Sequence, residues 1–174
     1  MVKKVSITGH TQGIGLALSN YFITKNYNVV GFSKSNGFDI TNSTSRQKII
    51  DYSKDTEIFV NNAYSNFDNS QLTLLDLIYT NWLNLDKIII NISTRFTNSD
   101  HNYSQSKQKL DNFCEQRVFN KLPYLINLKP GLTNTKRVES IKGERMDVSD
   151  IVNVVDYILS VKNSVRVTSI CFGK

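Results

Sequence analysis

The sequence predicts an α/β protein in which helices cover both faces of a doubly wound parallel sheet. Short apolar runs typical of strands alternate along the chain with amphipathic runs typical of helices. The run at residues 87–92 is almost wholly apolar, as in strands that are buried on both faces of a sheet. A glycine-rich turn joins the first strand to the first helix. Together these observations predict one Rossmann-like domain over residues 1–174.

The expected elements follow in order. We predict strands at residues 2–8, 28–32, 57–61, 87–92, 122–128 and 165–172, and helices at residues 13–25, 44–54, 71–84, 103–119 and 148–159. Only Lys34 to Gly37 separate the second strand from Phe38-Asp39-Ile40. A parallel crossover needs about a dozen residues or more. We therefore expect the third strand of a usual doubly wound sheet, and the helix before it, to be reduced or absent.

The composition is that of a globular protein, with 40% hydrophobic and 21% charged residues. No apolar run is long enough to span a membrane, and the N-terminus enters a strand directly, so we expect a cytoplasmic protein without a membrane partner. Cys114 and Cys171 lie far apart and lack the spacing of metal ligands, which predicts free thiols and no metal site.

The formal net charge of +6 does not predict a nucleic-acid partner, because the basic residues are scattered. The longest basic groups are Lys3-Lys4 and Lys136-Arg137, and no aromatic residues are interleaved with them. We expect a solvated basic surface that attracts anionic cofactors or substrates.

The glycine-rich turn is the first candidate binding site. It reads Thr8-Gly9-His10-Thr11-Gln12-Gly13-Ile14-Gly15, or Thr-Gly-x-x-x-Gly-Ile-Gly. The first N–H groups of a helix have no partners within the helix, and the helix dipole favours an anion there. Glycines let the backbone close around such an anion, so the turn predicts a phosphate site. A strand-to-helix turn without a ligand is the alternative.

The second candidate site contains Ser93, Tyr103 and Lys107. Ser93 follows an apolar strand, whereas Tyr103 and Lys107 lie four residues apart on one face of a predicted helix. A free tyrosine has a pKa of about 10, and a neighbouring ammonium lowers it. The set is therefore suited to reduction of a carbonyl, with Ser93 bonded to the substrate oxygen. An exposed tyrosine–lysine pair without chemistry is the other interpretation.

These motifs, in this order, resemble the short-chain dehydrogenase/reductase family over nearly the whole chain. The resemblance implies that Tyr103 is the catalytic acid/base and that Ser93 orients the substrate oxygen. It implies that Lys107 lowers the tyrosine pKa and binds the nicotinamide ribose.

The same resemblance implies a set of residues that contact a nicotinamide cofactor. Asp39-Ile40 is similar to the pair that holds the adenine ring, Asn62-Ala63 falls in the Asn-Asn-Ala-Gly element, and Pro130-Gly131 with Thr135 resembles the segment that contacts the carboxamide. The full expected set is Gly9, Thr11, Gln12, Gly13, Ile14, Gly15, Ser33, Lys34, Asp39, Ile40, Asn62, Ala63, Tyr103, Lys107, Pro130, Gly131, Thr133 and Thr135.

Charge at the end of the second strand favours NADP(H) over NAD(H). An acidic residue there would bond the ribose hydroxyls of NAD and repel a 2′-phosphate. Here the segment is Phe32-Ser33-Lys34-Ser35, with no acid. We therefore expect Ser33 and Lys34 at the 2′-phosphate, with NAD(H) as the alternative cofactor. The alternative interpretation of Lys34 is an exposed loop lysine that binds no ligand.

Three departures from the family affect the functional prediction. Tyr64 replaces the glycine of Asn-Asn-Ala-Gly, where its ring would crowd or stack on the cofactor. The family's catalytic asparagine has no counterpart, since Asn81 and Asn84 lie too close to the next strand. The loop at residues 136–147 is short for a segment that covers the substrate, which predicts an open pocket suited to a large or carrier-bound substrate.

The leading hypothesis is an NADP(H)-dependent oxidoreductase that transfers a hydride between nicotinamide and a carbonyl or alcohol, with Tyr103 as acid/base. A non-catalytic NADP(H)-binding sensor or regulator of the same fold is the alternative. A sugar-nucleotide reductase or epimerase is a third interpretation, although such enzymes normally add a C-terminal substrate domain. The family usually forms homodimers or homotetramers, and the apolar faces of the helices at residues 71–84 and 103–119 suit either an interface or the core.

Overall fold

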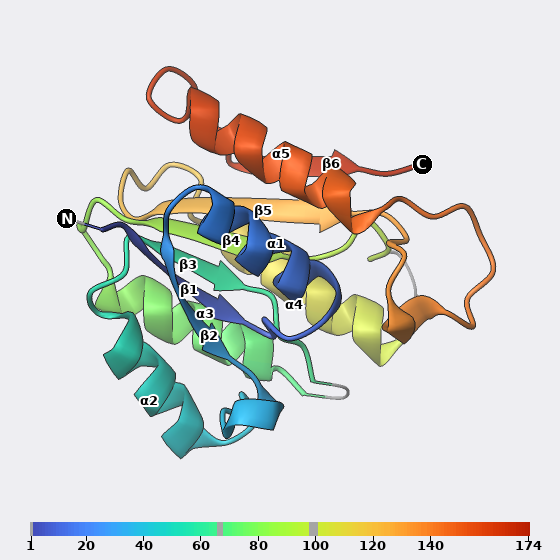
Figure 1. Cartoon of the computed structure of the whole chain (residues 1–174), viewed down its shortest axis with the longest axis horizontal. Coiled ribbons are helices and arrows are strands. Elements are labelled where there is room, and N and C mark those ends of the chain that lie inside the picture. The colour runs from blue at the N-terminus through green and yellow to red at the C-terminus, as the bar shows by residue number, and fades with distance from the viewer. Residues whose placement is uncertain (1, 66–67, 98–100) are drawn as a thin grey trace.

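A computed structural model describes residues 2–65, 68–97 and 101–174 (Figure 1). Six parallel strands form one sheet in the order β2-β1-β3-β4-β5-β6. The strands are β1 (Lys4–Thr8), β2 (Asn28–Phe32), β3 (Ile58–Asn61), β4 (Ile88–Ile92), β5 (Tyr124–Pro130) and β6 (Ser169–Phe172). The helices are α1 (Gly13–Thr24), α2 (Ser43–Ser53), α3 (Ser70–Asn81), α4 (Asn102–Glu115) and α5 (Val148–Val161).

Helices cover both faces of the sheet, as the sequence predicts. Helices α1 and α5 lie on one face, and α2, α3 and α4 lie on the other (Figure 1). The strand order runs outward from β1 and β3 in both directions, which is the doubly wound arrangement. All strands end at the same edge, so the residues that follow them meet there.

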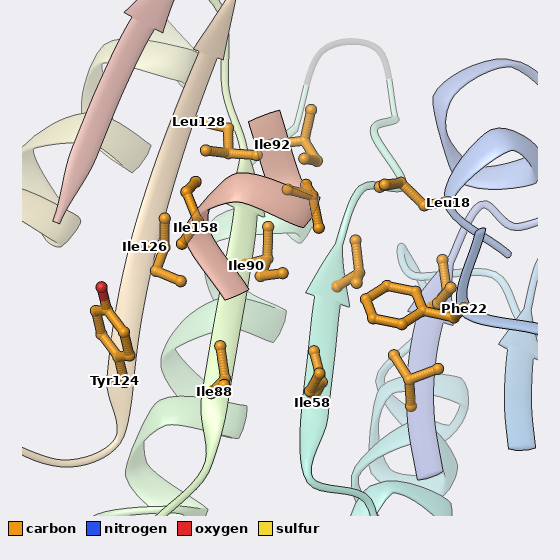
Figure 2. Close-up of a cluster of buried hydrophobic side chains, with 14 residues drawn as sticks. Leu18, Phe22, Ile58, Ile88, Ile90, Ile92, Tyr124, Ile126, Leu128 and Ile158 are labelled. Carbon is orange, nitrogen blue, oxygen red and sulfur yellow. The ribbon is translucent and has the colours of Figure 1, made fainter. Parts of the chain in front are cut away.

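Alternation along the strands builds two cores. On the α1 and α5 face, Leu18 and Phe22 of α1 and Ile158 of α5 pack against isoleucines of the sheet such as Ile90 (Figure 2). On the other face, Phe59, Ile89 and Leu125 of the sheet pack against α3. The α3 side chains in this core are Leu74, Leu75 and Ile78, and Trp82 directly follows the helix. Strands β3, β4 and β5 contribute to both cores, so they carry apolar residues at most positions. Strand β1 contributes Val5 and Ile7 to the first core only, and its other face carries the buried polar residues Ser6 and Thr8.

The predicted loss of the third strand and its preceding helix is confirmed. A single 3₁₀ turn, Lys34–Asn36, follows β2, and residues 38–40 form no strand. The chain turns back through Gly37, which has φ of 88°, so the ring of Phe38 packs edge-on against Phe32 at 4.9 Å between centroids. Ile40 is buried in the core below. Strand β2 is therefore an edge of the sheet.

Some element ends differ from the sequence prediction. Helix α4 ends at Glu115 rather than at residue 119, and Phe119 is 94% exposed, so no apolar contact extends the helix. Strand β6 begins at Ser169 rather than at residue 165. There the Val167 N–H donates to the Tyr124 hydroxyl instead of joining the backbone ladder. Among the described residues, no helix is long and apolar enough to cross a membrane.

Candidate active site

The glycine turn between β1 and α1 forms a tight, uncapped helix N-terminus. Gly9 and Gly13 have φ of 69° and 53°, a region that residues with a side chain rarely adopt. A Cβ on Gly15 would lie 2.1 Å from the Gly9 carbonyl oxygen. Gln12 precedes the helix in an extended conformation and its side chain makes no cap. The first N–H groups of α1 are thus presented without a side-chain acceptor, as an anion site requires.

The end of β3 is tied to this turn by hydrogen bonds. The Thr8 hydroxyl accepts from the backbone N–H groups of Asn62 and Ala63, both at 3.0 Å. The Asn62 side chain donates to the Thr8 carbonyl at 3.0 Å. These bonds bring Asn62 and Ala63 beside Gly9, as the sequence motifs predict.

The segment after β5 reaches the same turn. The Thr135 methyl group lies 3.1 Å from where a Cβ on Gly13 would be, a tight contact that adds to the strain of a side chain at φ of 53°. The Gly131 N–H donates to the Phe172 carbonyl, and the Thr133 hydroxyl donates to the Gly131 carbonyl at 3.0 Å. Pro130 is the last residue of β5. Hydrogen bonds therefore fix residues 130–135 beside the glycine turn, at the carboxyl edge of the sheet.

The end of β2 carries a cation and an anion in contact. Lys34 and Asp39 form an ion pair at 3.0 Å, with 67% and 36% of their side chains exposed. The Asp39 carboxylate accepts from the Thr41 N–H, and this bond, together with Lys34, lowers its pKa. The Ser33 hydroxyl is bonded to that of Ser35 at 2.8 Å. Lys34 thus has Asp39 as a partner, which the sequence analysis did not predict.

Two further members of the expected set differ in exposure. Thr11 is exposed in the glycine turn. Ile14 is half-buried and packs against the core on the α1 side.

Tyr103 and Lys107 lie on α4, one turn apart. The Lys107 side chain is nearly buried, and its ammonium donates to Gln71 Oε1 at 2.8 Å and to the Ile92 carbonyl at 3.0 Å. Burial lowers the Lys107 pKa to about 7, with a smaller lowering from Arg137 and an opposing effect of Asp111. The Lys107 nitrogen lies 5.7 Å from the centroid of the Tyr103 ring. The predicted tyrosine–lysine pair is therefore formed.

The structure brings Thr94, rather than Ser93, to the tyrosine. The Tyr103 hydroxyl is hydrogen-bonded to the Thr94 side chain. Ser93 is buried, and its hydroxyl has no hydrogen-bond partner among the described residues. Adjacent residues at a strand end point in opposite directions, so only one of the two hydroxyls can face Tyr103. The structure thus places the Thr94 hydroxyl at Tyr103, and the role of Ser93 stays a prediction.

Gln71 is a site residue that the sequence analysis missed. Besides accepting from Lys107, it donates through Nε2 to the carbonyls of Asn61 at 2.9 Å and Ile92 at 3.0 Å. It lies on the same face of α3 as Leu74, Leu75 and Ile78. The sequence could have indicated it, because Gln71 is a polar residue on a helix face that is otherwise apolar. Gln71 therefore holds the Lys107 ammonium in place between α3 and α4.

Two further side chains close over Tyr103. The Tyr64 ring stands edge-on to the Tyr103 ring, with centroids 5.1 Å apart, and lies 5.0 Å from the Lys107 nitrogen. The Arg137 guanidinium stacks over Tyr64 at 4.4 Å and lies 5.7 Å from the Tyr103 centroid. The Tyr64 ring therefore lies against Tyr103 and Lys107, whereas the sequence analysis expected it to crowd the cofactor.

The Tyr103 pKa is raised in this environment. Burial is the main cause, and Tyr64 adds to it, whereas Arg137 and the bond with Thr94 act in the opposite direction. The cation that lowers the phenol pKa is thus Arg137, where the sequence analysis expected Lys107.

A ladder of buried amides lies beneath the site. Asn61, Asn91 and Asn127 occupy paired positions on β3, β4 and β5. The Asn61 side chain donates to Asn91 at 2.9 Å, and Asn91 donates to Asn127 at 2.8 Å. Asn127 in turn donates to the buried Asp111 of α4 at 2.8 Å. Asn61 also donates to the Gln71 carbonyl, so the ladder connects both helices of the site to the sheet.

Solved structures share this fold. A 3-alpha-hydroxysteroid dehydrogenase from Pseudomonas sp. B-0831, complexed with NADH, superposes with a TM-score of 0.82 at 13% identity, covering 98% of this chain and 94% of that chain. A 4-hydroxyisoleucine dehydrogenase complexed with NADH gives 0.80 at 17% identity, covering 98% and 96%. A short-chain dehydrogenase from Burkholderia cenocepacia J2315, in complex with NADP, gives 0.79 at 16% identity, covering 97% and 87%. The chain has the short-chain dehydrogenase/reductase fold.

No family model and no curated protein sequence matches the chain, so the likeness to short-chain dehydrogenases/reductases is structural. It extends over nearly the full length of both chains in these three superpositions. In the part of the chain that the structure describes, only a 3₁₀ turn lies between β2 and α2.

Proposed function

We propose that this protein is an NADP(H)-dependent oxidoreductase that interconverts a carbonyl and an alcohol in a small-molecule or carrier-bound substrate. One observation carries the proposal. The Tyr103 hydroxyl is bonded to Thr94 and lies one helical turn from a buried lysine, at the sheet edge where the glycine turn also opens. A proton donor, an orienting hydroxyl and an anion site are thereby adjacent.

The residues at this edge fit a dinucleotide cofactor. The uncapped N-terminus of α1 suits a diphosphate, and Asn62, Ala63 and residues 130–135 border it. When bound, the nicotinamide would supply or accept the hydride. Tyr103 would hold the substrate oxygen and exchange its proton, Thr94 would orient that oxygen, and Lys107, fixed by Gln71, would keep positive charge beside the phenol.

The preference for NADP(H) rests on Lys34. It is the cation at the end of β2, and no acidic residue stands at Phe32, Ser33 or Ser35. A 2′-phosphate would compete with Asp39 for the Lys34 ammonium. We expect Lys34→Glu to weaken NADPH binding by about 100-fold and NADH binding by less than about 5-fold. Titration of nicotinamide fluorescence measures both, and equal effects on the two cofactors would refute the assignment.

The decisive experiment combines cofactor titration with a substitution of the tyrosine. Tyr103→Phe should abolish NADPH-dependent reduction in a carbonyl screen, because the phenol proton is lost. Tyr157→Phe on α5 is the matched control, since Tyr157 is 57% exposed and lies away from the sheet edge. Failure of the wild type to bind either cofactor would overturn the proposal.

The contacts of Tyr64 favour a second candidate function, a non-catalytic NADP(H)-binding sensor. Its ring and the Arg137 guanidinium already occupy the space beside Tyr103 and Lys107. In such a protein, Tyr103→Phe would leave the NADPH dissociation constant unchanged, and the wild type would turn over no carbonyl. Tyr64→Gly separates the two functions, because it should raise turnover in an enzyme and create none in a sensor that lacks chemistry.

A further inference from the structure

The buried face of α4 carries two opposite charges one helical turn apart. Lys107 and Asp111 are spaced i and i+4, which places their Cβ atoms about 6 Å apart on this face. Both point toward the sheet, since Lys107 bonds the end of β4 and Asp111 bonds a residue of β5. They are 4% and 5% exposed. Little solvent screens the attraction between two charges that are buried in this way.

Lys107 has no carboxylate in direct contact. Its ammonium donates to two neutral acceptors, Gln71 Oε1 and the Ile92 carbonyl, and among the described residues it forms no ion pair. A buried ammonium that is bonded only to neutral groups is disfavoured relative to the neutral amine. Burial accordingly lowers the Lys107 pKa to about 7, and Asp111 acts against this lowering.

Asp111 is held at one end of the amide ladder. Asn127 donates to one carboxylate oxygen at 2.8 Å, and the Lys129 ammonium lies 3.7 Å from the other. Each amide of the ladder donates in the direction of Asp111, from Asn61 to Asn91 and from Asn91 to Asn127. The N–H end of the ladder therefore faces the carboxylate, which is the arrangement that an anion requires.

The other end of the ladder reaches the acceptor of Lys107. Asn61 donates to the Gln71 backbone carbonyl at 3.2 Å, and the Gln71 side chain donates to the Asn61 carbonyl at 2.9 Å. Hydrogen bonds thus connect Lys107, through Gln71 and the three asparagines, to Asp111. The lysine and the carboxylate are therefore fixed relative to each other by buried bonds as well as by the helix.

The other titratable groups near Lys107 supply no negative charge at neutral pH. The Tyr64 and Tyr103 rings lie 5.0 Å and 5.7 Å from its nitrogen, and phenols are neutral near pH 7. Arg137 lowers the Lys107 pKa further through its like charge. Asp111 is thus the charge that favours the ammonium form.

The groups around Asp111 differ from it in burial or in charge. Lys129 of β5 pairs with Asp111 and also with Glu115, at 3.6 Å. The Glu115 side chain is 61% exposed, so solvent screens its charge from Lys107. The buried Cys114 thiol has a raised pKa and carries no charge.

We propose that Asp111 is a positioning residue of the candidate active site, which acts as the buried counter-ion of Lys107 and keeps the lysine charged near neutral pH. The inference rests on the proposed function, in which the Lys107 ammonium stands beside the Tyr103 phenol. No bond forms or breaks at Asp111. It acts on the proton transfer at Tyr103 only through Lys107.

Asp111→Asn tests this role, because it removes the charge and keeps an oxygen that accepts from Asn127. The titration of Lys107 should move down by about one pH unit. NMR of protein labelled with ¹³C-lysine follows this titration directly, and Lys107→Met assigns the signal. Glu115→Gln is the matched control, since it removes an exposed carboxylate that also pairs with Lys129. It should move the titration by less than about 0.3 pH units.

The pH profile of the reaction gives a second readout. The proposed function needs the ammonium form of Lys107, so kcat for NADPH-dependent reduction should fall as the pH rises through the Lys107 pKa. In Asp111→Asn this fall should occur about one pH unit lower, and in Glu115→Gln it should stay in place. An equal loss at every pH would mean a structural role only and would overturn the inference.

A second neutral variant covers the case in which the asparagine variant does not fold. Asp111→Ser is smaller, can still accept a hydrogen bond, and should lower the Lys107 titration to a similar pH. An unchanged Lys107 titration in either folded variant overturns the inference and leaves the reductase function intact. A wild type without NADPH-dependent turnover overturns the proposed function, and the NMR titration then still decides whether Asp111 sets the charge of Lys107.

Discussion

The Lys107 ammonium is nearly without solvent contact, being 4% exposed, and its pKa falls to about 7 because it is buried. An exposed lysine in the unfolded chain has a pKa of about 10.4. Between these values the unfolded chain binds more protons than the folded one, so the free energy of unfolding rises with pH. We expect a rise of roughly 1 kcal/mol per pH unit from pH 7 to pH 9.

Urea unfolding at pH 7, 8 and 9 measures this slope, and Lys107→Met is the matched variant. The methionine side chain should flatten the slope and raise stability at pH 7, since no charge is then buried. A wild type whose stability does not depend on pH in this window would show that the Lys107 pKa is not lowered. Tyr103, whose pKa is raised, acts in the opposite direction only near pH 10.

Two adjacent hydroxyls give a sharp comparison. Thr94→Val should lower kcat by about 10²-fold or more, because it removes the hydroxyl that bonds Tyr103 and would bond the substrate oxygen. Ser93→Ala should leave kcat within about 3-fold, because the Ser93 hydroxyl has no partner among the described residues. Steady-state kinetics on one carbonyl substrate measures both. A larger loss in Ser93→Ala would restore the serine to the role that its sequence position suggested.

The sequence predicts part of this site for reasons that can be traced to single residues. Tyr103 and Lys107 are predictable because their spacing on one helix fixes their relation. Thr94 and Arg137 are not predictable. Which side chain faces the site just after a strand depends on tertiary contacts, and so does the path of the loop that carries Arg137. Gln71 is an intermediate case. The sequence shows that it is a polar residue on an apolar helix face, but it does not show that Lys107 is its partner.

At the scale of elements, the amide ladder holds three strands and two helices in one arrangement. Asn91 is completely buried and is bonded to both Asn61 and Asn127. Asn91→Ala should lower the free energy of unfolding by roughly 2–4 kcal/mol, because an acceptor for Asn61 and a donor for Asn127 are lost in the core.

Denaturant titration checks this value against Asn81→Ala, an exposed asparagine at the end of α3. That control should change stability by less than about 0.5 kcal/mol. A similar small change for Asn91→Ala would mean that the ladder contributes specificity of strand pairing but not stability.

The order of the elements was predictable because alternation of strand and helix patterns is strong in this chain. Their ends were not, because they depend on local competition such as the Val167 N–H bonding a side chain. The missing crossover after β2 was predictable because it is a matter of chain length alone: Lys34 to Gly37 cannot span a helix.

At the scale of the whole molecule, one sheet serves two cores. Trp82 is the only tryptophan and is buried in the core under α3 and α4. If the chain is a single domain, tryptophan fluorescence and far-ultraviolet circular dichroism should give the same unfolding midpoint, because removing either core exposes the same strands. Two separated transitions would mean that the faces unfold independently and would contradict the single-domain prediction.

The two cysteines differ in exposure, so their alkylation rates report on opening of the structure. Cys171 is exposed on the edge strand β6, whereas Cys114 is buried on α4, where burial raises the thiol pKa. An alkylating reagent should therefore modify one thiol at once and the other only while α4 is lifted from the sheet. Because α4 also carries Tyr103 and Lys107, the alkylation rate of Cys114 measures how often α4, and the candidate active site with it, separates from the sheet. A bound cofactor that contacts both α1 and α4 would lower this rate.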